Sequence, residues 1–246
     1  MLCLEHVDYR YARDSPVVLH DTSLVFRHGI TALLGRNGAG KSTVLSLLAT
    51  SLMADGGCVS VDGLRATRRT LTEYRKRVAW MPQRIVPMRG FTVLESVVYA
   101  GWLGGLSTHE AEERTGSALS RVSLSDRSGD KASTLSGGQL RRLGIAQCLV
   151  RDAPWLLLDE PFAGLDPIER LSLERVLKSL SGTVDMVVST HQTHDVVDVF
   201  DYVTVIDHGD SIWQGAPQEF FELGRSVQGM GNDPGAAAFA SLVSRS

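Results

Sequence analysis

The sequence contains little cysteine and no long apolar run. Its three cysteines, Cys3, Cys58 and Cys148, lack metal-binding spacing, and an odd number cannot all pair within one chain. We therefore expect reduced thiols, as in a cytosolic protein. No apolar stretch approaches the roughly 18 residues that a membrane-spanning helix needs. Residues 1–11 also lack the apolar core of a signal peptide, so we expect neither a spanning helix nor a secretion signal.

An excess of charge of one sign is also missing. The chain carries 25 Lys and Arg against 28 Asp and Glu, which gives a formal net charge of −3. A protein that binds nucleic acid electrostatically has a basic surplus, so we expect no nucleic-acid partner. Internal repeats, heptad runs and long low-complexity segments are absent as well. With 43% hydrophobic residues in 246, the chain can bury one sizeable core.

Glycine is plentiful, and one glycine-rich stretch organises the chain. Residues 35–43 fit the phosphate-loop pattern G-x-x-x-x-G-K-[ST]. The apolar run at 30–34 predicts a buried strand before it, and apolar residues at helical spacing in 42–53 predict a helix after it. Glycines allow the backbone to approach an anion closely, and the N–H groups of a helix start attract phosphate. The expected phosphate-binding residues are Gly35, Asn37, Gly38, Ala39, Gly40, Lys41, Ser42 and Thr43.

Two of these side chains have more specific expected roles. Lys41 should reach the β- and γ-phosphates of a nucleotide as a point charge. Ser42 should offer its hydroxyl to Mg²⁺. The alternative, a glycine-rich turn followed by a surface lysine, does not account for the agreement of strand, loop and helix.

Two carboxylates follow another apolar run. Trp155-Leu156-Leu157-Leu158 shows no polar alternation, which is typical of a parallel strand buried on both faces. Asp159 and Glu160 come directly after it, at the edge of the sheet where ligands bind. We expect Asp159 to bind Mg²⁺ through water and Glu160 to orient and activate the attacking water.

Two further polar residues occupy equivalent places at strand ends. Gln83 follows the predicted strand at 78–81, and His191 follows the apolar strand that begins at Met186. We expect Gln83 to contact the nucleotide and its metal ion, and His191 to contact the γ-phosphate. His194 and His208 lack this placement and are expected at the surface.

A second glycine-rich turn precedes a predicted helix. Residues 135–139 are Leu-Ser-Gly-Gly-Gln, and apolar residues then recur at helical spacing. Its Ser136, Gly137, Gly138 and Gln139 could therefore hold phosphate at a second helix N-terminus. Downstream, Asp166 lies in the turn Gly164-Leu165-Asp166-Pro167, where it can form an Asx turn or reach a neighbouring molecule.

An aromatic residue near the N-terminus is a candidate for stacking on a purine. Tyr9 and Tyr11 fall on the same side of a predicted strand at 2–11. Tyr11 opens the following loop and is freer to face a ligand, so it is the expected stacking residue. The alternative is that both tyrosines are half-buried residues of the strand.

The rest of the chain divides into three parts. Residues 84–150 are expected to form a helical subdomain inserted in the nucleotide-binding core, with an N-cap at Ser107. Residues 202–213 are expected to form a final hairpin. Residues 224–246 turn to Gly, Ala and Ser and are expected to be a loosely ordered tail, which leaves 1–223 as the nucleotide-binding domain.

Together these motifs resemble the ATP-binding cassette (ABC) family, the ATPase subunits of ABC transporters. The likeness covers roughly residues 2–215. Residues 35–43 resemble the Walker A motif, 156–160 resemble Walker B with its catalytic glutamate, and 135–139 match the LSGGQ signature letter for letter. Single residues complete the resemblance: the adenine-stacking aromatic at Tyr11, the Q-loop at Gln83, the D-loop at Asp166 and the switch histidine at His191.

The resemblance implies an α/β fold of the P-loop NTPase class, with a RecA-like core, a small antiparallel β element and an inserted helical subdomain. It implies ATP and Mg²⁺ as cofactors, with Glu160, His191 and Lys41 as catalytic residues. It also implies a head-to-tail dimer, with an identical or a related ATPase subunit, in which the signature of one copy closes over ATP bound by the other. Transmembrane permease subunits would hold the protein at the cytoplasmic side of a membrane. Residues 91–106 and 189–192 look most like stand-alone exporter ATPases.

Other functions remain open at this point. A cytosolic ABC-type ATPase could serve a soluble assembly, such as iron–sulfur cluster building, and fractionation with membranes or with the soluble pool would separate the two. DNA-repair cassettes carry long coiled coils or zinc modules between the halves of the site, where this chain has a short helical insertion. Tandem translation-factor ATPases need two cassettes, and one is present. The sequence does not name the transported substrate.

Overall fold

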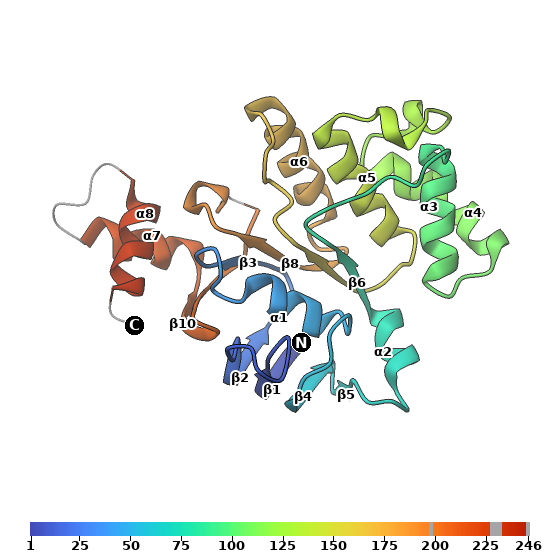
Figure 1. The fold of residues 1–246 in the computed structure, drawn as a ribbon. Helices are drawn as coiled ribbons and strands as arrows, with labels where there is room; N and C mark the ends of the chain where they lie inside the picture. Colours follow the sequence, from blue (N-terminus) through green and yellow to red (C-terminus); the bar gives the residue numbers. More distant parts are fainter. Residues whose placement is uncertain (197–198, 227–232, 245–246) are drawn as a thin grey trace.

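A six-stranded sheet forms the centre of the protein in the computed structural model, which describes residues 1–196, 199–226 and 233–244 (Figure 1). Five neighbouring strands are parallel, and β10 pairs antiparallel at one edge. The strands, in spatial order, are β10 (Asp210–Gly215), β9 (Tyr202–Asp207), β3 (Ile30–Leu34), β8 (Asp185–Thr190), β7 (Trp155–Leu158) and β6 (Val78–Met81). The α/β class and the final hairpin predicted from the sequence are confirmed.

The central strands are buried on both faces, as the apolar run before Asp159 predicts. In β7, Trp155 and Leu157 join one hydrophobic cluster, whereas Leu156 and Leu158 join the other. All four are fully buried. Because neither face of the strand can accommodate a polar side chain, polar groups are confined to the ends of the strands.

A second, antiparallel sheet packs below the first helix. Its strands, in spatial order, are β2 (Leu19–Phe26), β1 (Leu2–Tyr9), β4 (Gly56–Val61) and β5 (Leu64–Arg65). Helix α1 (Lys41–Leu48) lies between this sheet and the central one, and buries four apolar side chains in their shared core: Val44, Leu45, Leu47 and Leu48. Helix α2 (Leu71–Arg77) leads from this sheet to β6.

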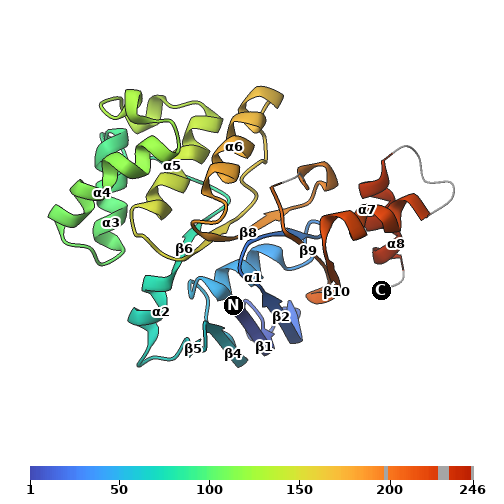
Figure 2. The ribbon, with the colours of Figure 1, turned by 180° about the vertical axis from the view of Figure 1, so that it is seen from behind.

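The segment expected to be a helical insertion consists of helices gathered at one side of the molecule (Figures 1 and 2). Its longer helices begin at serine or threonine capping boxes, and Ser107 is one of the caps, as predicted. The helices are α3 (Val93–Leu103), α4 (Thr108–Arg121), η1 (Ser125–Arg127), η2 (Ala132–Thr134) and α5 (Gly137–Leu149). After β7 the chain continues through α6 (Pro167–Leu180) and, beyond β8, through the short η3 (Thr193–Asp195).

The C-terminal part differs from the expectation of a loosely ordered tail. Helix α7 (Pro217–Ser226) is followed by α8 (Pro234–Val243), which packs against it at the end of the molecule farthest from α3 and α4. Asp233 caps α8 by accepting a hydrogen bond from the Ala236 N–H at 3.0 Å. The alanines are good helix formers and let the two helices approach closely, so the expectation is wrong over 234–243. Residues 224–226 of the expected tail are the end of α7, and 227–232 and 245–246 lie outside the described residues.

No helix in the described ranges combines the length and the apolar character needed to cross a bilayer.

Gly224→Ala tests the packing of α8 on α7. A Cβ at Gly224 would lie 1.7 Å from the carbonyl oxygen of Pro234, so α8 must move. We expect the free energy of unfolding to fall by about 1–3 kcal/mol, and residues after Ser226 to be cleaved faster in limited proteolysis. Gly116→Ala on α4 is the control, because a Cβ added there would meet no other atom within 4 Å. Equal stability and equal protection of the two variants would contradict the packing described.

Candidate nucleotide-binding and catalytic site

Four polar segments meet at one edge of the central sheet. Strands β3, β8, β7 and β6 run parallel, so their carboxyl ends lie together. The phosphate loop follows β3, Gln83 follows β6, Asp159 and Glu160 follow β7, and His191 follows β8. The strand-end placement predicted from the sequence is therefore confirmed, and it assembles one site from segments more than one hundred residues apart.

The phosphate loop has the backbone that its glycines permit. Gly38 and Gly40 have φ angles of 86° and 101°, in the left-handed region that favours glycine. Gly40 caps α1 without a side-chain hydrogen bond, which leaves the N–H groups of the first turn available. A Cβ at Gly35 would lie 2.7 Å from the Ile206 carbonyl oxygen. The loop can thus close around an anion at a helix N-terminus.

Lys41 points back into its own loop. Its ammonium donates hydrogen bonds to the carbonyl oxygens of Gly35 at 2.8 Å and Arg36 at 3.2 Å, and lies 3.4 Å from Oε1 of Glu160. The side chain is 6% exposed. Burial lowers the pKa of Lys41, and the neighbouring Glu160 carboxylate opposes that shift. Two neutral carbonyl groups and one carboxylate hold the ammonium at the loop. Phosphate oxygens of a bound nucleotide can replace these partners.

Asp159 and Ser42 bring oxygen ligands together beside the loop. The Ser42 hydroxyl donates to Oδ1 of Asp159 at 3.1 Å, and the Ser189 hydroxyl donates to the same atom at 2.6 Å. Mg²⁺ prefers oxygen ligands and commonly takes one or two carboxylates together with phosphate oxygens. In the described part of the chain no group of three or more His, Cys, Asp or Glu side chains could hold a metal ion. The residues present fit Mg²⁺ that is shared with a nucleotide rather than a metal held by protein alone.

Glu160 is the most constrained side chain of the site. Its φ of 48° is unusual for a residue with a Cβ, and its backbone N–H donates to the Ser189 hydroxyl at 2.9 Å. Its carboxylate lies between Lys41 and His191, whose Nδ1 is 2.7 Å from Oε2. These contacts fix a buried carboxylate at the mouth of the phosphate loop, where a general base would be needed.

A cavity of about 460 Å³ opens at the phosphate loop, and neither Asp159 nor His191 is among its described lining residues. Its lining includes the phosphate loop, Gln83, Glu160 and Tyr11. Tyr11 is 61% exposed, and its hydroxyl is 2.9 Å from the Thr43 hydroxyl. Tyr9 is 7% exposed and contacts the edge of the Tyr11 ring. The structure therefore places Tyr11 at the cavity and Tyr9 in the core.

The signature turn lies elsewhere. Ser136 caps α5 and donates its hydroxyl to Oε1 of Glu169 at 2.7 Å, and Gln139 completes the capping box. Asp166 caps α6 by accepting from two backbone N–H groups. Within the part of the chain that the structure describes, neither 136–139 nor Asp166 lines the phosphate-loop cavity. The N-termini of α1 and α5 could each bind an anion, but within the described residues of one chain they do not line the same cavity.

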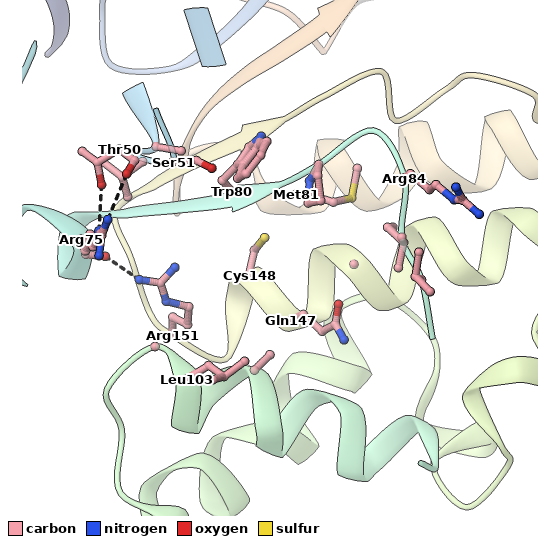
Figure 3. A pocket seen from close by; sticks show the side chains of 18 residues that line it. Thr50, Ser51, Arg75, Trp80, Met81, Arg84, Leu103, Gln147, Cys148 and Arg151 are labelled. Atoms are coloured by element: carbon pink, nitrogen blue, oxygen red, sulfur yellow. Dashed lines mark hydrogen bonds between the residues drawn. The ribbon is translucent and has the colours of Figure 1, made fainter. Parts of the chain in front are cut away.

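A second cavity, of about 510 Å³, lies between β6 and the helices α3 and α5 (Figure 3). Arg75, Arg84 and Arg151 are its charged lining residues, and no described lining residue is acidic. Arg75 is held by the hydroxyl and carbonyl oxygens of Thr50. The Arg151 Nε and the Trp80 indole N–H are buried without hydrogen-bond partners. The cavity therefore favours a partner that brings apolar groups and a carboxylate.

Sequence reasoning missed several residues that support the site. Ser189 links Asp159 to the Glu160 backbone, and Thr190 is bonded to Asp195 in the turn after His191. The signal was present as two consecutive hydroxyl residues at the end of an otherwise apolar strand. The surface positions predicted for His194 and His208 are confirmed.

Comparisons with known proteins agree with this geometry. The family described as ABC transporter matches residues 19–163. The chain is 33% identical to an uncharacterized ABC transporter ATP-binding protein, YxlF, of Bacillus subtilis (strain 168), over 89% of this chain and 72% of that protein. It is 35% identical to the energy-coupling factor transporter ATP-binding protein EcfA2 of Streptococcus thermophilus (strain ATCC BAA-491 / LMD-9), over 90% and 83% of the two chains.

A solved structure shares the fold. CbiO1 of Clostridium perfringens, described as part of the ABC transporter complex cbiONQ, is 27% identical over 90% of each chain, with a TM-score of 0.76. The RecA-like P-loop fold expected from the sequence is thereby confirmed. The family match over more than half of the chain, together with these relatives and the assembled phosphate-loop site, shows that the chain belongs to the ATP-binding cassette family as the ATP-hydrolysing subunit of an ABC transporter.

Proposed function

We propose that this ATPase subunit binds Mg-ATP in the phosphate-loop cavity and hydrolyses it in a head-to-tail dimer. The observation that carries the proposal is the separation of two sites in one chain. Glu160 contacts Lys41 of the phosphate loop and His191, whereas Ser136 contacts Glu169 and is not among the described residues that line that cavity. Two-fold pairing with an identical or related subunit would bring each signature turn to the other copy's nucleotide.

The loop residues have distinct proposed roles. The backbone N–H groups of Gly38, Ala39 and Gly40 would cradle the phosphates, with Asn37 and Thr43 flanking them. Ser42 and Asp159 would hold Mg²⁺, with Gln83 reaching it from the end of β6. When bound, Mg²⁺ neutralises charge on the phosphate oxygens. Tyr11 would stack on the adenine at the outer side of the cavity.

Hydrolysis would use the groups that already touch one another. Glu160 would orient a water molecule and accept its proton, and His191 would keep the carboxylate in place while facing the γ-phosphate. Lys41 would exchange its bonds to loop carbonyls for bonds to the β- and γ-phosphates. The signature residues Ser136, Gly137, Gly138 and Gln139, with Asp166, would complete the enclosure from the other copy.

The second cavity supports a membrane partner. A segment of a transmembrane permease that carries an acidic residue would satisfy the buried Arg151 Nε and pair with Arg75 and Arg84. Such a partner would hold the subunit at the cytoplasmic side of a membrane. Dimerisation of the subunits on ATP binding would then move the permease segment that occupies the cavity. Export is the proposed direction, and it rests on the resemblance of the sequence to exporter ATPases.

Glu160→Gln tests the catalytic role. The amide keeps the shape of the side chain but cannot accept the proton, so turnover should fall by roughly 10²–10⁴-fold while ATP still binds. Phosphate release and equilibrium ATP binding would be measured on the same preparation. Glu113→Gln, an exposed change of the same kind on α4, is the control. Normal turnover in Glu160→Gln would remove Glu160 from the catalytic role.

Ser136→Arg tests the shared site. The arginine would block the signature turn against a partner's nucleotide but leave the phosphate loop of its own chain untouched. We expect ATP affinity to persist and turnover to be lost. Ser107→Arg removes an equivalent capping serine from α4, which costs about 1 kcal/mol of stability, and should retain turnover. Unchanged turnover in Ser136→Arg would argue against pairing through the signature.

Tyr11→Ala tests the stacking contact. Loss of a base–aromatic contact should weaken ATP binding by about 1–3 kcal/mol, which calorimetry on the Glu160→Gln background can measure without hydrolysis. Tyr11→Phe keeps the ring and removes the hydroxyl near Thr43, so it should bind ATP nearly as well. If both variants lose the same affinity, the hydroxyl contact and not the ring is what matters.

A further inference from the structure

We propose that the ion pair between Arg170 and Asp195 positions His191 against Glu160, and so sets the geometry of the catalytic carboxylate. Arg170 lies on α6, and Asp195 ends the short turn η3 that follows His191. Neither residue lines the phosphate-loop cavity or belongs to a motif found in the sequence. The inference rests on the proposed function, because it concerns the orientation of His191 during hydrolysis.

Asp195 organises the backbone on both sides of His191. One carboxylate oxygen accepts a hydrogen bond from the Thr190 hydroxyl, and the same hydroxyl oxygen accepts from the Gln192 N–H at 3.1 Å. The Asp195 N–H in turn donates to the Gln192 carbonyl oxygen at 3.1 Å. Thr190 is therefore bonded to the Asp195 carboxylate, and Gln192 is bonded to the Thr190 hydroxyl and to the Asp195 backbone N–H, which limits where the imidazole between them can point.

Arg170 holds that carboxylate from a different element. Its guanidinium pairs with the other oxygen of Asp195 and donates to the His194 carbonyl oxygen at 2.9 Å. It also contacts Glu174 at 3.2 Å and lies 5.3 Å from the centre of the Phe162 ring. A planar, multidentate donor with this many partners has few alternative positions.

The burial of the pair argues for a positioning role. Asp195 is 3% and Arg170 17% exposed at the side chain. A buried ion pair is often no more stabilising than apolar residues of the same volume, because desolvation offsets the attraction. Stability alone therefore gives little reason to place one here. What the pair does provide is a fixed distance between α6 and the turn that carries His191.

The connection reaches further along α6. Asp166, which is proposed to complete the other copy's site, is the N-cap of this helix, and Arg170 lies one turn later. Phe162, under the guanidinium, follows Glu160 closely in the chain. A displacement of the start of α6 on pairing would thus be transmitted to His191 through Arg170 and Asp195. Dimerisation could in this way change the position of the Glu160 carboxylate without acting through the nucleotide.

Arg170→Gln is the main test, with Asp195→Asn as a milder second variant. A misplaced catalytic group can cost up to about 10²-fold in rate, so we expect kcat to fall roughly 10–100-fold with KM for ATP nearly unchanged. Arg175→Gln is the matched control, because Arg175 is an exposed arginine of the same helix. It should retain the wild-type rate. Thermal unfolding of all variants shows whether they remain folded.

A double-mutant cycle separates positioning from general structure. If Arg170 acts through His191, then Arg170→Gln should not lower kcat further in a protein that already carries His191→Ala. The His191 ring resonance in NMR is a readout independent of turnover. It should move in Arg170→Gln and in Glu160→Gln, and stay in place in Arg175→Gln.

Each outcome decides the proposal. If Arg170→Gln lowers kcat by the same factor with and without His191→Ala, the proposal is overturned. It is also overturned if the His191 resonance moves in neither Arg170→Gln nor Asp195→Asn. A full rate in His191→Ala would also overturn it, while leaving the ATPase function intact. Failure of the wild-type protein to hydrolyse ATP would instead reject the proposed function, and the resonance shift would still report whether the pair holds His191.

Discussion

The parallel strands β3, β6, β7 and β8 are covered on both faces, so polar side chains can reach solvent only where these strands end. Their common direction places all four ends along one edge. Asp159 and Glu160 therefore meet the phosphate loop at this edge, and His191 meets Glu160 there. The location of the site is a consequence of how the core is buried.

Charge balance at that edge explains the contacts among the catalytic groups. Lys41 and Glu160 are both almost fully buried and lie 3.4 Å apart, with His191 on the other side of the carboxylate. Each buried charge is thus compensated by a neighbour. A triphosphate would replace Glu160 and the loop carbonyls as partners of Lys41, which would leave the carboxylate available to a water molecule. The protein holds these three side chains together by contacts that a triphosphate is suited to displace.

The other half of the site is built by capping. Ser136 and Asp166 both begin helices, and both satisfy backbone N–H groups of their own chain. The hydroxyl of Ser136 is additionally occupied by Glu169. These contacts keep the signature turn in a defined shape at a surface, where a second copy would find it. In this view the site is completed by dimerisation and not by the folding of one chain. The Arg170–Asp195 ion pair connects α6, which would lie at the dimer interface, with His191 and Glu160.

Local sequence was sufficient for most of the elements and for the strand-end positions of the candidate site residues. Glycine spacing at 35–40, the apolar run before Asp159 and the capping pattern at Ser107 each express a short-range physical preference, and the structure contains the element that each one predicts. Composition alone misjudged residues 234–243, because the ordering of α8 comes from its contact with α7, and small residues make such contacts possible without signalling them. The hydrogen bond of Ser189 to Asp159 and the ion pair of Arg170 with Asp195 join residues that are 30 and 25 positions apart (189 − 159 and 195 − 170), in different parts of the fold. Such pairings were decided by the tertiary structure, because a side chain's partner depends on how strands and helices pack and not on its neighbours in the chain.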